Sequence, residues 1–269
     1  MNATAAPWIW PLSPPAKVRE QVWAFAGAPD RWSRGLRGIA AAAAAGAIPV
    51  VLSAAFSVPG HQLLSALALI ALCLACVRRD AGRDAVGLIL VAFLVHNVAV
   101  MLLVADSPER MARVLPGADA YWHKQLDWIR TGWDPEYEPL AWLPAHLGLL
   151  GGDIVYSYAS LGWITFAEGF REVDWMNYYS VRLMQCSWNP LTAGLLGWHV
   201  WSLVRGVGFA FVTVEVLSLS LGRLAGRELS TPRARRWRWG LGLGLLLLDG
   251  ALKAVLLRPV QEALLANLR

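Results

Sequence analysis

Residues 38–57 read GIAAAAAAGAIPVVLSAAFS, and this stretch indicates the fold class. It carries no charged side chain over the roughly twenty residues that an α-helix needs to cross the hydrocarbon core of a bilayer. Its alanines give the helix a side of small residues, which lets another helix approach closely. We therefore expect a membrane-spanning helix that packs tightly against a neighbour.

The rest of the chain repeats this pattern. Hydrophobic residues make up 57% of the 269 residues and charged residues 16%, whereas a soluble domain carries about a quarter charged residues. The sequence predicts an all-α, polytopic helical membrane protein with about five transmembrane helices, in a range of five to seven. The four further predicted spans are residues 62–77, 85–104, 204–222 and 239–258.

Composition divides the chain into four segments. Residues 1–37 form an N-terminal segment with an amphipathic helix, and residues 38–104 form a three-helix membrane segment. Residues 105–203 form a Trp-rich extracytoplasmic segment at the membrane interface. Residues 204–269 form a two-helix membrane segment with a short tail.

The charges predict the orientation. Residues 1–37 and the loops 78–84 and 223–238 together carry 14 cations and five acids, whereas segment 106–203 carries six cations and eleven acids. Cytoplasmic loops of membrane proteins are enriched in Lys and Arg. We therefore expect a cytoplasmic N-terminus, in a plasma or inner membrane. The net charge of +5 reflects this topology, and no nucleic-acid partner is expected.

Residues 140–167 leave the number of spans open. The stretch is long enough to cross a membrane, but Pro144, Gly151, Gly152 and Asp153 interrupt it. The charge pattern requires an even number of crossings between residues 106 and 203. Five spans result if 140–167 is re-entrant or lies in the interface, and seven if a second crossing occurs near 188–203. We favour five.

Residues 168–186 predict an amphipathic helix. At about 100° per residue, most polar side chains fall on one side and the apolar ones on the other. Such a helix is suited to lying in the outer membrane interface. Its polar side is charge-balanced and provides the candidate partner-binding residues. These are Arg171, Asp174, Tyr178 and Arg182.

Three ionisable residues lie within predicted spans, where charge is costly and functional roles are frequent. Glu215 is in residues 204–222, and Asp249 and Lys253 are in residues 239–258. If these two spans pack against each other, the three side chains form one intramembrane charge cluster.

Several motifs of known chemistry are missing. The sequence has no HExxH, GxSxG or Walker A motif. Cys73 and Cys76 lie in an apolar run and read as core residues. A haem held by His96 and His199 is disfavoured, because the two residues are expected at different depths. No metal site and no cofactor are predicted.

Three functions remain open, and whether the protein is an enzyme is left undecided. The leading hypothesis is a non-catalytic subunit or scaffold that holds a protein partner or a lipid at the outer membrane face. A transporter component would use Glu215, Asp249 and Lys253. A membrane-embedded enzyme would act on a lipid or lipid-linked substrate. Its candidate catalytic residues are Glu168, Glu172, Asp174, His199 and Arg205.

Overall fold

The computed structural model describes residues 14–133 and 139–269, and these residues form helices connected by short turns. Residues 1–13 and 134–138, which fall in the predicted N-terminal and Trp-rich segments, lie outside the described residues. The helices are α1 (Ala16–Gly27), the 3₁₀ helix η1 (Asp30–Trp32), α2 (Gly35–Phe56), α3 (His61–Arg78), α4 (Gly82–Asp106), α5 (Pro108–Val114), α6 (Ala118–Thr131), α7 (Pro139–Ser160), α8 (Trp163–Gln185), α9 (Pro190–Gly197), α10 (Val200–Ala225) and α11 (Pro232–Asn267).

Five stretches among the described residues are long and apolar enough to cross a membrane. They are α2, α3, α4, the pair α9–α10 and α11. Four of them contain a predicted span, and α2 covers the predicted span 38–57 except for its last residue. The predicted class, an all-α polytopic membrane protein, is therefore confirmed.

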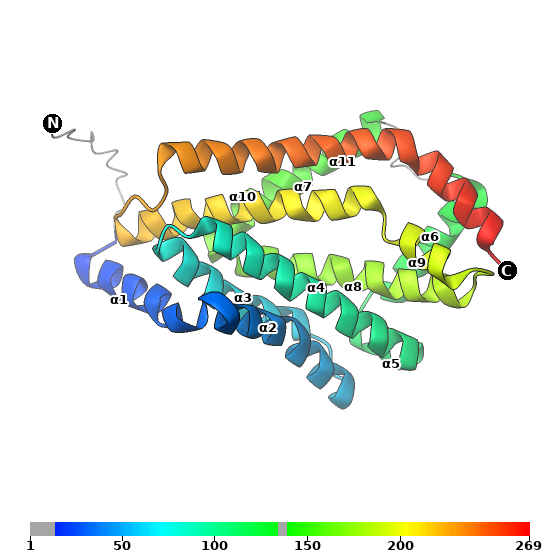
Figure 1. Ribbon diagram of the computed structural model, residues 1–269, viewed down its shortest axis with the longest axis horizontal. Helices are drawn as coiled ribbons and strands as arrows, with labels where there is room; N and C mark the ends of the chain where they lie inside the picture. The colour runs from blue at the N-terminus through cyan, green and yellow to red at the C-terminus, as the bar shows by residue number, and fades with distance from the viewer. Residues whose placement is uncertain (1–13, 134–138) are drawn as a thin grey trace.

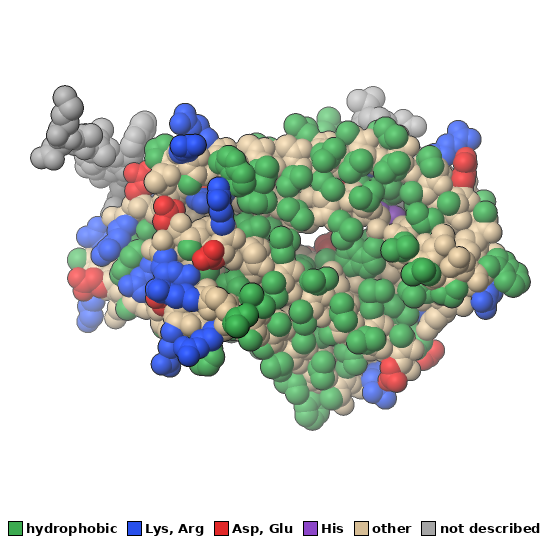
Figure 2. Space-filling model, in the orientation of Figure 1, with side chains coloured by type: hydrophobic (Ala, Val, Ile, Leu, Met, Phe, Trp, Pro, Cys, Tyr) green, Lys and Arg blue, Asp and Glu red, His purple; other side chains and the backbone are tan. Residues whose placement is uncertain are grey.

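The long helices run roughly along the longest axis of the molecule (Figure 1). One end holds α1, the C-terminal end of α10 and the start of α11, and most of the visible Lys and Arg side chains gather there (Figure 2). We call this the basic end. The opposite end holds α5, α6 and α9. Between the two ends, the visible surface is mostly hydrophobic (Figure 2).

Large apolar side chains project from this middle region into the surroundings. Leu94 is 64% exposed, Leu102 66%, Leu247 76% and Val255 71%. This pattern is costly for a water-soluble protein and is the one expected where a helix meets lipid. The outward faces of α4 and α11 therefore fit a bilayer.

Small residues allow close contact between the helices, as the alanine-rich span predicts. A Cβ atom added to Gly46 of α2 would lie 2.2 Å from the carbonyl oxygen of Ala92 in α4. A Cβ at Gly208 of α10 would lie 3.0 Å from the carbonyl oxygen of Gly242 in α11. In both pairs, the two helices therefore approach each other closely at a glycine.

Helices α7 and α8 form a hairpin in which α7 packs against α10, and α8 packs against α3 and α4. Their connection at Gly162 packs against Ile70 of α3 and Leu217 of α10. Near the basic end, Arg223 of α10 donates a 2.6 Å hydrogen bond to the Tyr158 hydroxyl of α7. The segment 188–203 forms α9 and the start of α10. Helices α7 and α8 are not among the five stretches that are long and apolar enough to cross a membrane, so the number of crossings between residues 106 and 203 stays a prediction.

The interior contains two hydrophobic clusters, one toward each end, and α8 contributes to both. Phe166 and Phe170 belong to the cluster at the basic end. Tyr178 and Leu183 belong to the cluster at the opposite end. The residues of α8 between these two groups include Asp174, which places this carboxylate at the junction of the two clusters.

Candidate functional site

A buried carboxylate joins two histidines from different helices. The Asp174 Oδ2 atom of α8 lies 3.0 Å from Nε2 of His61, the first residue of α3. The Asp174 Oδ1 atom lies 2.8 Å from Nε2 of His96, in α4. The side chains of all three residues are at most 1% exposed. We call these three residues the His–Asp centre.

Two neighbouring groups hold the His–Asp centre in place. Gln62 donates a 2.6 Å hydrogen bond from Nε2 to Asp174 Oδ2. The Nδ1 atom of His96 lies 2.9 Å from the carbonyl oxygen of Gly46. Because Gly46 has no side chain, α2 can lie close enough to α4 to present this carbonyl oxygen to the histidine ring.

These contacts determine the proton positions on His96. A carbonyl oxygen only accepts hydrogen bonds, so the Nδ1 atom of His96 must carry the proton. In the neutral ring, Nε2 is then a bare lone pair directed at the Asp174 carboxylate, which is repulsive. A metal ion ligated by Nε2 of His96 and Oδ1 of Asp174 would remove this repulsion.

Aromatic rings close off one side of the His–Asp centre. The ring centroids of His61 and His96 lie 5.6 Å apart. Phe170 of α8 lies 4.7 Å from the His96 ring and stacks on Phe93 at 4.3 Å. One turn further along α8, Asn177 donates a 2.9 Å hydrogen bond to Asn97 of α4. The surroundings therefore strengthen any electrostatic interaction made there.

The three side chains can together ligate a metal ion. One ligand atom from each of His61, His96 and Asp174 lies within 4.8 Å of the others. Imidazole nitrogen and carboxylate oxygen are ligands of zinc and of other transition metals. No metal site was predicted from the sequence, in which these three residues lie far apart.

The five candidate catalytic residues do not converge. Glu168 and Glu172 lie at the surface of α8, where Arg171 forms ion pairs with both. His199 is stacked on Trp201 with ring centroids 4.6 Å apart, and Arg205 donates a 3.1 Å hydrogen bond to His146. Asp174 is therefore the one member of this set that lies in the His–Asp centre.

The candidate partner-binding residues do not share one exposed surface. Arg171 is exposed, Asp174 and Tyr178 are buried, and Arg182 packs over the Trp122 ring at 5.9 Å. The expected polar, solvent-facing side of helix 168–186 is thus wrong at Asp174 and Tyr178. The physical reason is that polar side chains of α3, α4 and α6 cover it, in place of water.

The expected intramembrane charge cluster is divided between two places. Glu215 accepts hydrogen bonds from Arg235 at 3.2 Å and from Arg238 at 2.7 Å. Asp249 lies 3.6 Å from His146 of α7 and is buried, as is Lys253. Arg238 and Asp249 are separated by roughly 16 Å along α11 at 1.5 Å per residue. The structure therefore does not bring Glu215 to Asp249.

Sequence reasoning missed His61 and noted His96 only as a haem ligand. His61 follows a Pro-Gly turn, which reads as an exposed loop, yet its side chain is fully buried at the start of α3. A signal was available in His96, because an ionisable side chain within a span is a functional candidate. Its partner Asp174 lies 78 residues away and His61 lies 113 residues from Asp174, so their contact has no local signature.

The fold and the His–Asp centre define an integral, polytopic helical membrane protein with a buried set of possible metal ligands. No protein-family model matches this chain, and comparisons with characterised proteins and with solved structures give no match either.

Proposed function

We propose that the protein is a membrane-embedded, metal-dependent enzyme whose metal ion is held by His61, His96 and Asp174. This proposal develops the enzyme alternative of the sequence analysis and places its chemistry in the His–Asp centre. The substrate class is a lipid or lipid-linked molecule at the outer membrane face.

The observation that carries the proposal is the arrangement around His96. A histidine that ligates a metal commonly donates its other ring N–H to a backbone carbonyl or a carboxylate. His96 has this arrangement, because Nδ1 donates to Gly46 and Nε2 faces Asp174. His96 and Asp174 would both act as ligands of a bound metal ion, and their contact would then be favourable.

The number of ligands favours catalysis over a structural role. Structural zinc sites use four protein ligands, whereas catalytic sites use three and leave the fourth position to water. His61, His96 and Asp174 provide three. A metal ion bound there would lower the pKa of its water to about 7 and so supply a hydroxide for hydrolysis. Gln62 would orient the Asp174 carboxylate through its hydrogen bond.

The position of the centre supports a substrate from the membrane. His61 lies 17 residues from Arg78, or roughly 26 Å along α3, a distance close to the thickness of the hydrocarbon core. The centre therefore lies far from the basic end. Gln62 is partly exposed and is followed by exposed Leu63 and Leu64. A lipid approaching this side would meet Gln62 before reaching Asp174.

Metal analysis of protein purified without chelator tests the metal site. We expect stoichiometric zinc, or stoichiometric Co²⁺ after exchange, with loss of the metal in Asp174→Asn and in His96→Asn. The matched control is Asp153→Asn, which removes another buried carboxylate, bonded to Thr213. Wild-type protein that binds neither ion, or equal metal content in Asp174→Asn, would contradict the proposal.

Incubation with a total membrane lipid extract tests the enzyme assignment. We expect hydrolysis products in mass spectra with the metal-loaded protein, and none after metal removal or with Asp174→Asn. A metal-loaded protein that changes no lipid would exclude lipid hydrolysis. That result would favour the non-catalytic subunit, for which the sequence analysis expected a partner or lipid at the outer face.

A further inference from the structure

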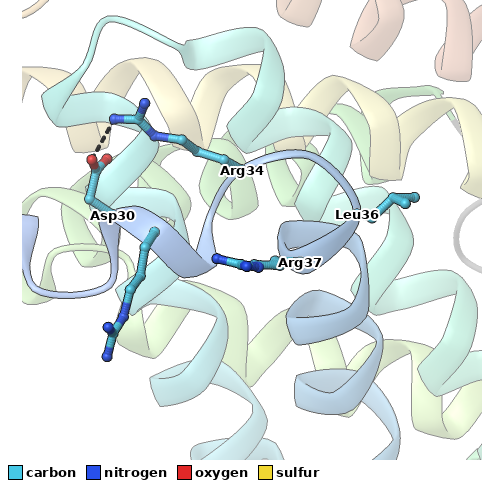
Figure 3. A pocket seen from close by; sticks show the side chains of 5 residues that line it. Asp30, Arg34, Leu36 and Arg37 are labelled. Atoms are coloured by element: carbon cyan, nitrogen blue, oxygen red, sulfur yellow. Dashed lines mark hydrogen bonds and ion pairs between the residues drawn. The ribbon is translucent and has the colours of Figure 1, made fainter.

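The connection between α1 and α2 forms an open pocket at the basic end. Figure 3 shows the side chains that line it, which come from η1 and from the start of α2. They are Asp30, Arg31, Arg34, Leu36 and Arg37. Three arginines and one leucine around a shallow opening suggest a ligand that is anionic at one end and apolar at the other.

The acidic residue of the pocket already has partners. Asp30 accepts a 2.5 Å hydrogen bond from Arg34 and another of 2.5 Å from Arg79 of α3. The hydrogen bond from Arg79 holds the pKa of the Asp30 carboxyl below its ordinary value of 3.8, so the carboxylate stays ionised at neutral pH. Its charge is therefore matched by Arg34 and Arg79 and is not available to the other two arginines.

Arg31 and Arg37 have no acidic partner among the described residues. The guanidinium of Arg31 lies 5.9 Å from the centroid of the Trp32 ring. Both arginines are exposed, and no carboxylate of the described residues lies within 4.0 Å of either. The pocket thus has two uncompensated cations with guanidinium groups suited to bidentate phosphate binding.

Apolar side chains continue from the pocket along the lipid-facing side of α2. Leu36 is 83% exposed, Trp32 52% and Ile39 48%. Further along the same helix, Ile48 and Val51 are also exposed. Tryptophan is enriched at the level of lipid headgroups. The pocket therefore lies where a headgroup phosphate and the start of an acyl chain would both be within reach.

We propose that this pocket binds the headgroup of an anionic phospholipid. Arg31 and Arg37 contact the phosphate, and Leu36 and Trp32 contact the glycerol and acyl region. Basic pockets on the cytoplasmic side of membrane proteins bind anionic headgroups, and each nearby cation strengthens the attraction to the anionic leaflet. This site shares no lining residue with the His–Asp centre.

Lipid retention measured by native mass spectrometry tests the proposal. Protein is incorporated into nanodiscs of phosphatidylglycerol and phosphatidylcholine and then released into detergent. We expect wild type to retain phosphatidylglycerol in preference to phosphatidylcholine. The variant Arg31→Gln plus Arg37→Gln should reduce this preference about tenfold or more, because it removes two cations from the contact.

The control removes the same charge elsewhere at the basic end. Arg233→Gln plus Arg236→Gln changes two exposed arginines of α11 and should leave the preference unchanged. Equal loss in the two double variants would show a general charge attraction and overturn the site. Retention displaced by inorganic phosphate at concentrations that leave the detergent micelle intact would show a phosphate site without lipid specificity, which also overturns it. Because both pairs are exposed, thermal unfolding should match wild type.

Discussion

At the scale of single residues, Asp174 joins three helices through one carboxyl group. It contacts His61 and Gln62 of α3 and His96 of α4, while its own backbone belongs to α8. An isolated ionised carboxylate at this burial would be strongly unfavourable. The contacts with Gln62 and the two histidine rings compensate this cost and hold α3, α4 and α8 together.

Gln62 offers a test that leaves the three ligands intact. We expect Gln62→Leu to weaken Co²⁺ binding by about 10–100-fold, because groups that orient a ligand have effects of this size. Titration of metal-free protein with Co²⁺, followed by visible absorption, measures the change. Gln185→Leu is the control, since Gln185 is an exposed residue of α8. Unchanged affinity in Gln62→Leu would mean that its hydrogen bond does not orient Asp174.

The burial of the Glu215 ion pair predicts that a single variant of this pair is less stable than the double variant. Glu215→Gln leaves Arg238, which is 5% exposed, without its acidic partner, whereas Arg235 keeps its ion pair with Glu228. Breaking a buried pair in this way costs about 3–5 kcal/mol, whereas replacing both partners by apolar residues can be neutral. We expect a lower unfolding temperature for Glu215→Gln than for Glu215→Leu plus Arg238→Leu, measured in detergent. The reverse order would mean that the pair is not buried.

At the scale of helices, the contact between α2 and α4 depends on Gly46. A methyl group at this position would overlap the carbonyl oxygen of Ala92 and separate the Gly46 carbonyl from His96. We expect Gly46→Ala to lower both the thermal stability and the metal content. Gly87→Ala in α4 is the matched control, because a Cβ there has no atom within 4 Å. Equal behaviour of the two variants would show that the helices can move apart at no cost.

The positions of the helices could be predicted from the sequence, but their packing could be predicted only in part. The five spans followed from hydropathy, because lipid-facing helices must be apolar along their length. The surroundings of α8 could not be predicted from hydropathy. A helical-wheel projection identifies a polar side of the helix but not the side chains that cover it. Here the cover consists of His61, His96 and Asp119, from helices distant in the sequence. Glu215 was likewise expected to lie near Asp249. The sequence alone does not show that Arg238 is the charged partner of Glu215.

At the scale of the whole molecule, the orientation remains a prediction. Reporter fusions after residues 80, 130 and 230 should report a cytoplasmic, an extracytoplasmic and a cytoplasmic location. The reason is the concentration of Lys and Arg at the basic end, seen in Figure 2. A reporter after residue 230 on the extracytoplasmic side would show an odd number of crossings between residues 106 and 203. That result would contradict the even number of crossings that the charge pattern predicts.

The length of α3, which has 18 residues, also affects the thickness of the bilayer around it. At 1.5 Å per residue, α3 is roughly 27 Å long, slightly less than the hydrocarbon core of about 30 Å that surrounds it. A bilayer adapts to a short span by thinning locally, at a small free-energy cost for each ångström. The thinning would lower the headgroups at the N-terminal end of α3 toward the partly exposed Gln62. Acyl-chain length in the host membrane would then control how easily a headgroup reaches Asp174.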